Sequence, residues 1–462
     1  MDSFLPPRRL PWTDLWLLAP FLAHIGLTAA AGATGEYLEF GPLDWGVFAA
    51  TALYVVAALP ALRGGRFGRG FVRGSGYLLI VLLVFEAVAR AVYPFPPAQV
   101  PFRTGTTQAE IKYDLPGLHG SVQLTTNELG LIGDEINQRD LDAMDLRILC
   151  VGGSTTESIF VTDGKRWPRA LQDKLAARLG RRVFVGNAGR SGNFTLHHIN
   201  QLRDYPLAQK FDFVVIQVGC TDFTAHDEGV YYGEDLREGI RKYSLEQVDA
   251  RAGLTTYYRA LSSYRLLSRL LGRAPPGWRP PDVNDGRVYV TERQRRQEAL
   301  AHGVVEDPPP RLDRYLAHYR EDLRSLIEMC RELRLEMVFT TQPHLFHAGM
   351  PPDLEALLNS GLVYDAERPR EVDITRGAYS PAALERAIDA FNRTTLEICA
   401  QEGVDCIDLA GILPHDTSVF YDDYHFNISG CDRVAEILAD HFTSRLGGTR
   451  RGETIDAALD DK

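Results

Sequence analysis

The chain has 462 residues, of which 45% are hydrophobic, 24% charged and 10% aromatic, and this composition excludes a disordered chain, a collagen and a coiled-coil rod. The formal net charge of -11 argues against a general nucleic-acid binder, because neutralising phosphates requires a basic face. We therefore expect a folded enzyme that acts on neutral or cationic material.

Three long apolar runs in the first 95 residues predict a membrane-embedded region. They cover residues 15–35, 45–62 and 74–93, each close to the roughly 20 residues that a helix needs to cross a bilayer. Arginines precede the first run and separate the second from the third, whereas the loop between the first two carries only acidic charges. This asymmetry predicts a cytoplasmic N-terminus and a periplasmic or extracellular C-terminal part. Core helices of a soluble domain are the alternative.

The rest of the chain has the pattern of an α/β protein. Residues 96–140 open with a proline-rich stretch and are expected to form a linker and leading segment. Beyond it, short apolar runs alternate with amphipathic helical patterns up to residue 447, and a polar tail, 448–462, follows. This alternation predicts a parallel sheet that is covered on both faces. The expected strands lie at 147–153, 182–189, 211–219, 336–343 and 405–410.

Individual helix boundaries can also be predicted. Ser380 and Pro381 have the residue types of an N-cap and a first helical turn, and Gly403 is expected to end that helix. The helical pattern that follows the first expected strand should stop at Gly180.

An insertion at 223–311, between the third and fourth expected strands, is too long for an ordinary connection. It is either a cap that shapes the substrate site or a docking surface toward the membrane region, and the sequence leaves both open. The six cysteines form no CxxC pair, so we expect scattered buried thiols rather than a zinc ribbon or a disulfide scaffold.

Candidate chemistry follows the expected strands, because open α/β sheets bind ligands at the carboxyl ends of their strands. In GGSTTES, Ser154 begins a helix whose N-terminus can stabilise negative charge; an N-cap serine is the structural alternative. GNAGRSGN follows the second strand, and its glycines permit backbone N–H groups to face an anion. VGCTDF follows the third strand.

A further motif lies near the C-terminus, where Asp422 stands three residues before His425 in YDDYHF. A carboxylate at this spacing can hold an imidazole in one tautomer while its other nitrogen faces a serine hydroxyl. A surface Asp and a satisfied His give the same short pattern, so its value comes from being the last of four ordered motifs.

These four motifs, in this order, resemble the blocks of the SGNH hydrolase family of GDSL-type esterases and lipases over residues 145–445. The resemblance implies a flavodoxin-like three-layer α/β/α sandwich, with Ser154 as the nucleophile, Asp422 as the orienting carboxylate and His425 as the general base. It also implies that no metal and no organic cofactor take part.

Two positions depart from the family pattern. Gly153 stands where many members have Asp, and we expect this difference to leave the chemistry unaffected. The resemblance implies an oxyanion hole formed by Ser154, Gly192 and Thr221, but Thr221 replaces the family's Asn. Losing one such donor typically costs about a hundred- to thousandfold in rate, although a Thr hydroxyl can still donate.

Three more polar residues are expected near the substrate: Asn193, which could also reach the oxyanion, Asp222 and His344. The expected ligand is an ester-bearing glycan or lipid. A nucleic acid is not expected, and an envelope-assembly protein is a candidate partner.

Three functions remain open at this point. The first is a membrane-anchored esterase that removes acyl groups, such as acetyl from an envelope polysaccharide, or that cleaves a lipid ester. The second is an O-acyltransferase that uses the same serine, with a sugar hydroxyl in place of water, and three spans would then require a separate acyl-translocating partner. The third is a binding protein that has kept the fold and lost activity.

Overall fold

A computed structural model describes most of the chain beyond the expected membrane region. The described residues are 49, 53–54, 74–75, 77–78, 81–89, 105–127, 129–227, 286–309, 312–364 and 372–448. By internal contacts the chain divides into two units, one formed by residues 1–98 and 246–278 and the other by 99–245 and 279–462. The second unit contains the sheet and the candidate site.

The expected membrane spans lie mostly outside the described residues. The first span, 15–35, lies wholly outside them, and the other two are described only at some positions. No helix within the described part of the chain is long and apolar enough to cross a bilayer. Residues 81–89 are helical, and several of their apolar side chains are exposed: Val81, Leu82, Leu83, Val84, Phe85 and Val88.

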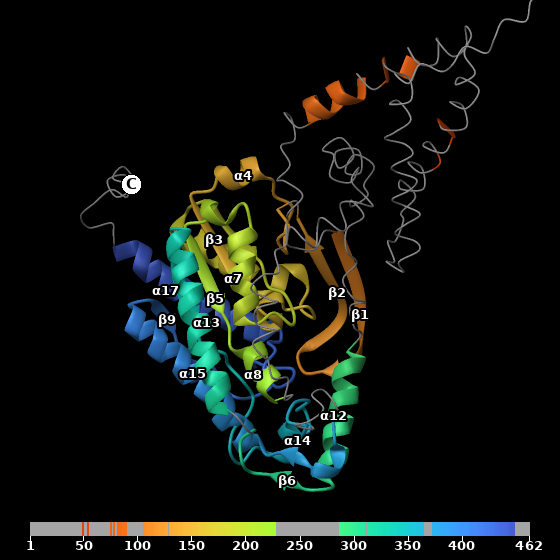
Figure 1. The fold of residues 1–462 in the computed structure, drawn as a ribbon, viewed down its shortest axis with the longest axis vertical. Coiled ribbons are helices and arrows are strands. Elements are labelled where there is room, and N and C mark those ends of the chain that lie inside the picture. Colours follow the sequence, from red (N-terminus) through yellow and green to blue (C-terminus); the bar gives the residue numbers. More distant parts are fainter. Residues whose placement is uncertain are drawn as a thin grey trace, which may run out of the picture. The chain divides into compact units, whose positions relative to one another are not determined.

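Five parallel strands form the central sheet in the order β4-β3-β5-β7-β9 (Figure 1). Their bounds are Leu146–Gly152 for β3, Val183–Asn187 for β4, Phe213–Gln217 for β5, Glu336–Thr340 for β7 and Asp405–Ile407 for β9. Numbered along the chain, the order is 2-1-3-4-5, the flavodoxin-like arrangement. The predicted α/β fold and all five predicted strands are confirmed, since each strand lies where a continuous apolar run was found.

Helices cover the sheet on both faces. The chain passes first from β3 to the edge strand β4 and then returns to add β5, β7 and β9 on the other side of β3. Because crossovers between parallel strands are right-handed, this reversal places the helix of the first crossover and the helices of the later ones on opposite faces. On one face, α6 (Trp167–Leu179) packs against α17 (Ile428–Gly448). On the other face, α7 (Thr195–Asp204), α13 (Leu312–Glu332) and α15 (Pro381–Glu402) pack side by side (Figure 1).

Two helix boundaries confirm the sequence prediction. The Ser380 hydroxyl accepts a hydrogen bond from the backbone N–H of Ala383, and α15 ends at Gly403, whose φ of 65° is left-handed. Helix α6 ends in the same way at Gly180, with φ 61°. Glycine is favoured at both ends because a side chain strains this backbone conformation.

Some elements lie where the sequence predicted only a linker or an insertion. The leading segment 96–140 contains an antiparallel hairpin, β1 (Gly105–Leu115) and β2 (Leu118–Thr126), so it is not an extended linker throughout. These strands were not predicted because their polar Thr and Gln residues obscure the alternation of buried and exposed positions, which is regular only near the end of β2. The insertion contains α12 (Arg287–Leu300) and β6 (Val304–Val305), which pairs with β8 (Ala378–Tyr379).

Short helices connect the main elements. They are α4 (Gln138–Asp142), α5 (Ser154–Glu157), α8 (Cys220–Asp227), α14 (Pro352–Glu355), α16 (Leu409–Ile412), η2 (Asp163–Lys165), η3 (Ala208–Lys210) and η5 (Ile374–Arg376).

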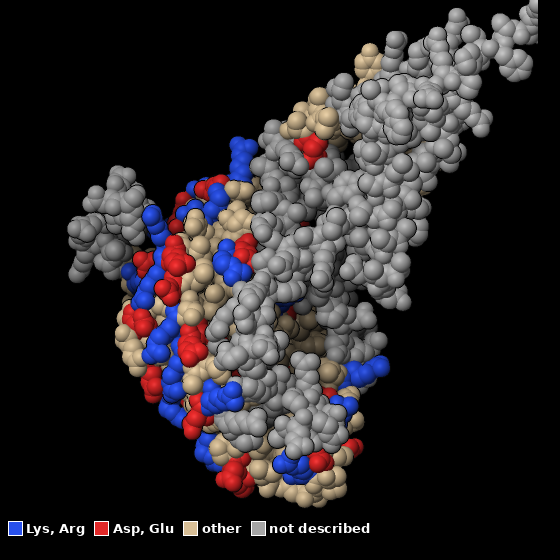
Figure 2. Space-filling view, viewed as in Figure 1, with Lys and Arg blue, Asp and Glu red and all other residues tan. Residues whose placement is uncertain are grey.

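Basic and acidic side chains are interspersed on the outer face that α13 and α15 form (Figure 2). Glu402 at the end of α15 joins the two helices by an ion pair with Arg331, at 3.0 Å. This face carries no single-sign patch of the kind that a nucleic-acid backbone would need.

The six cysteines are free thiols, as predicted. Five are buried and Cys406 is half-buried, so they act as small apolar core residues.

Candidate active site

Ser154 lies at the C-terminal end of β3, as the first residue of α5. Its turn is compact: a Cβ placed on Gly152 would lie 2.2 Å from Thr156 Oγ1 and 2.5 Å from the backbone oxygen of Gln217, so only glycine fits there. The Ser154 side chain is half-buried, whereas Thr155 and Thr156 are buried beneath it. The turn therefore presents one hydroxyl at the edge of the sheet.

A continuous hydrogen-bond relay connects Ser154, His425 and Asp422. Ser154 Oγ lies 2.7 Å from His425 Nε2, and His425 Nδ1 lies 2.7 Å from Asp422 Oδ2. A carboxylate can only accept, so Nδ1 carries the proton and Nε2 is left to accept from the serine hydroxyl. The structure thus brings together the three residues named from the sequence, although 271 positions separate Ser154 from His425.

Backbone N–H groups hold the Asp422 carboxylate in place. Asp422 is fully buried, and its Oδ1 accepts from the N–H groups of Tyr424 and His425. The next residue, Asp423, is also fully buried and accepts from the N–H of Asn359. Burial and the charge of Asp422 raise the pKa of Asp423 to about 6. These contacts fix the loop that carries the imidazole.

Two of the residues expected near the oxyanion, Thr221 and Asn193, lie close to Gly153. Gly192 has φ +79°, the left-handed conformation that frees a backbone N–H in a turn. A Cβ placed on Gly153 would lie 2.9 Å from Thr221 Oγ1 and 3.6 Å from the backbone oxygen of Asn193. Thr221 and Asn193 therefore both border the residue before Ser154. A side chain at position 153 would therefore meet Thr221, whereas the glycine leaves this space free, and our expectation that Gly153 does not affect the chemistry stays a prediction.

Glu157 links the first and second motifs, and sequence reasoning missed this role. Its side chain is fully buried and accepts from the Ser191 backbone N–H at 2.7 Å and from the Ser191 hydroxyl. Asn187 adds a second link by donating to the backbone oxygen of Thr156. The loop that carries Gly192 is thereby fastened to the turn that carries Ser154. The only sequence signal was an acidic residue in a short helix after the serine.

Asp222 was expected to bind substrate, but its carboxylate is engaged within the protein. It accepts from the Thr195 hydroxyl at 2.9 Å and from the Thr195 backbone N–H at 3.3 Å, at the start of α7. Burial, and then the charge of Asp322, raise the pKa of Asp222 to about 7. Asp222 is half-buried and its carboxylate holds the first residue of α7, so a role in binding substrate stays a prediction.

His344 was also expected near the substrate, and it is only 1% exposed. Its Nε2 lies 3.1 Å from Asp389 Oδ1, and its ring stacks on Phe346. The histidine is thus packed inside the protein against Phe346 and Asp389. Among the described residues, no group of three or more His, Cys, Asp or Glu is arranged to hold a metal ion.

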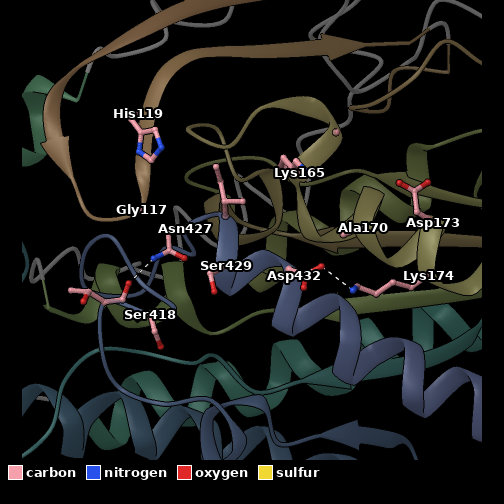
Figure 3. A pocket seen from close by; sticks show the side chains of 13 residues that line it. Gly117, His119, Lys165, Ala170, Asp173, Lys174, Ser418, Asn427, Ser429 and Asp432 are labelled. Atoms are coloured by element: carbon pink, nitrogen blue, oxygen red, sulfur yellow. Dashed lines mark hydrogen bonds and ion pairs between the residues drawn. The ribbon is translucent and has the colours of Figure 1, made fainter.

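A cavity of about 660 Å³ lies at the start of α17 (Figure 3). It is bordered by the β1–β2 hairpin at His119, by α6 at Lys174 and by α17 at Ser429, and neither Ser154 nor His425 lines it. Lys174 is already paired with Asp432 across it, at 2.8 Å. The cavity is therefore a surface hollow separate from the Ser154 relay.

Comparison with known proteins gives the following likenesses. A search of curated proteins found no match. Among solved structures, the chain is similar to LAE5, an alpha/beta hydrolase enzyme from the metagenome of Lake Arreo, with 13% identity, a TM-score of 0.34, and coverage of 66% of this chain and 96% of that one. It is also similar to Axe2, an acetylxylan esterase from Geobacillus stearothermophilus, with 15% identity, a TM-score of 0.33, and coverage of 66% and 95%.

A family model matches more than half of the chain. The matched residues, 150–433, begin in β3 just before Ser154 and extend past His425, so they contain all four motifs. The chain belongs to the GDSL-like lipase/acylhydrolase family.

Proposed function

We propose that this protein is a membrane-anchored serine esterase that hydrolyses an acyl ester. The observation that carries the proposal is the relay from Ser154 Oγ through the His425 imidazole to the Asp422 carboxylate, with both contacts at 2.7 Å. Membership of an acylhydrolase family supports the same reaction class.

In the proposed mechanism His425 Nε2 takes the proton of the Ser154 hydroxyl as Oγ attacks the ester carbonyl carbon. Asp422 stabilises the imidazolium that forms. The tetrahedral intermediate collapses when His425 returns the proton to the leaving alcohol, which leaves an acyl group on Ser154. Water, deprotonated by His425, then attacks this acyl-enzyme, and the acid and the free serine are released.

The negative charge that develops on the carbonyl oxygen needs preorganised donors. The backbone N–H groups of Ser154 and Gly192 are the proposed main donors, and the Thr221 hydroxyl is the proposed third. The contact of Thr221 with the Gly153 position and the left-handed backbone at Gly192 support this assignment.

The proposed substrate is an O-acyl ester, most simply an O-acetyl group, on a polysaccharide of the cell envelope. The charge pattern of the N-terminal loops supports this choice, because it predicts a catalytic domain on the outer side of the membrane. The three apolar runs and the exposed apolar side chains of residues 81–88 support the anchor. Alkaline extraction of membranes tests it: the full chain should stay with the lipid, and release into the carbonate wash would contradict the anchor.

Hydrolysis of p-nitrophenyl acetate by the full chain in detergent tests the reaction. We expect turnover that Ser154→Ala lowers by about 10⁴-fold or more. Ser325→Ala, a change at an exposed position on α13, is the matched control and should behave as wild type. Activity that survives Ser154→Ala would refute the proposal, and a wild-type protein without turnover would favour a binding role.

Substrate choice needs a second assay. Acetate release from an O-acetylated polysaccharide is compared with fatty-acid release from a lipid ester in mixed micelles. The proposal expects the first to be faster, and faster lipid cleavage would contradict the substrate assignment. An acetyl group that appears on an added glycan acceptor instead of in water would identify an acyltransferase, which would depend on a membrane partner for its acyl donor.

A further inference from the structure

Helix α12 carries one side chain of the insertion to the catalytic imidazole. The Tyr289 ring stands edge-to-face with the His425 ring, with centroids 5.9 Å apart and an interplanar angle of 82°. The same ring makes edge contacts with Tyr421 at 5.8 Å and with Phe160 at 5.4 Å. Tyr289 is thus part of a small aromatic cluster that has the imidazole at its border.

Two tyrosines of the histidine's own loop complete this enclosure. Tyr421 stacks parallel on His425, with centroids 5.6 Å apart and an interplanar angle of 10°, and Tyr424 lies at 4.8 Å. The imidazole can hydrogen-bond to Asp422 and Ser154 at the same time in only one ring orientation. Packing from three sides opposes rotation out of it, and the stacked face of Tyr421 favours the imidazolium that forms during the reaction.

The position of α12 is fixed by arginines that donate to backbone carbonyls. Arg293 Nη2 donates to the Tyr421 oxygen at 2.7 Å, and its Nε donates to the Leu357 oxygen at 2.9 Å. Arg296 is completely buried and donates to the carbonyls of Ser360 and Tyr379. One helix therefore holds both the backbone of the loop, through Tyr421, and the ring of His425.

From these contacts we infer that Tyr289 and Arg293 are positioning residues for the general base His425. This inference rests on the proposed function. The sequence left open whether the insertion shapes the substrate site or docks toward the membrane region. The inference assigns the first role to α12, which contacts the general base.

The test measures kcat and KM for p-nitrophenyl acetate with the full chain in detergent. Tyr289→Ala should lower kcat by about ten- to hundredfold, the range for a catalytic group that is slightly misplaced, and leave KM within twofold. Tyr289→Phe keeps the ring and should restore kcat to near the wild-type value. Arg293→Ala should also lower kcat. Arg295→Ala is the matched control, because this exposed arginine on the same helix pairs with Glu292 of its own helix and should give wild-type kinetics.

Failure of this inference is distinguishable from failure of the proposed function. If Ser154→Ala abolishes turnover while Tyr289→Ala leaves kcat within twofold of wild type, the positioning role is wrong and the esterase assignment stands. If Ser154→Ala retains full turnover, the esterase assignment is wrong. Should Tyr289→Ala fail to fold by circular dichroism, Tyr289→Leu, which keeps apolar volume without a ring, decides by the same kcat criterion.

Discussion

The hydroxyl of Thr221 occupies the space into which a side chain at position 153 would project. A Cβ on Gly153 would lie only 2.9 Å from Thr221 Oγ1. A side chain at position 153 would therefore press on this hydroxyl.

Gly153→Ala should reduce turnover because the new methyl group displaces the Thr221 hydroxyl from the proposed oxyanion hole. We expect a loss of about tenfold in kcat, smaller than for complete removal of a donor. The double variant Gly153→Ala, Thr221→Ala should be no worse than Thr221→Ala alone, because the two changes act on one contact. Additive losses in this cycle would show that the two positions act independently.

Thr221→Asn should preserve or raise esterase turnover. An amide reaches farther than a hydroxyl and supplies the donor that the family pattern has at this position. Steady-state kcat with p-nitrophenyl acetate, together with a thermal unfolding midpoint, checks this expectation. A clear loss of kcat in a normally folded variant would show that threonine has a role of its own here.

Ser191→Ala should lower kcat with little change in KM. The substitution removes the hydroxyl that donates to the buried Glu157 carboxylate and loosens the loop that holds Gly192. Since that loop supplies a proposed transition-state donor, we expect a loss of about tenfold or more in kcat. Glu157→Gln, which keeps the shape of the side chain, should give a loss in the same direction.

Glu328→Gln is the control for the Glu157 change, because Glu328 is exposed on α13 far along the chain from the motifs. Equal kinetics for Glu157→Gln and this control would remove the proposed role of the Glu157–Ser191 contact.

Asp222 should give the protein a distinctive dependence of stability on pH. Its pKa is raised from 3.8 to about 7, so between these values the unfolded chain has lost a proton that the folded protein keeps. The contribution of Asp222 to stability is therefore full below pH 3.8 and is lost as the pH rises through about 7. Asp222→Asn should remove this contribution to the pH dependence of the free energy of unfolding.

Urea unfolding midpoints between about pH 4 and 8 measure this effect. The Asp222→Asn variant should gain on wild type as the pH rises, because its amide does not ionise. Asp353→Asn, at an exposed position in α14, should follow the wild-type curve. Parallel curves for wild type and Asp222→Asn would contradict the assignment of the pH dependence to this carboxyl.

The sequence predicted the sheet because local patterns specify buried parallel strands. A run such as residues 213–217 is apolar at nearly every position, and in the structure it is buried at all of them. Helix ends such as Ser380 and Gly403 could be predicted equally well, since capping depends on one or two adjacent residues. The candidate catalytic residues came from short motifs in a fixed order.

Contacts between segments far apart in the sequence could not be predicted in the same way. Nothing near Tyr289 in the sequence points to an imidazole 136 positions later, and the approach depends on arginine contacts to carbonyls of other loops. The contact of Asp222 with Thr195 and the burial of His344 were not predicted for a similar reason. A polar residue after a strand can face a ligand or a neighbouring helix, and only the packed structure decides between them.

Covalent labelling of the full chain with a fluorophosphonate tests whether His425 activates the Ser154 hydroxyl. We predict a single adduct, located by peptide mass spectrometry on Ser154, that forms at least about a hundredfold more slowly in His425→Ala because the hydroxyl has lost its base. An adduct on another residue, or labelling of Ser154 at an unchanged rate without His425, would contradict it.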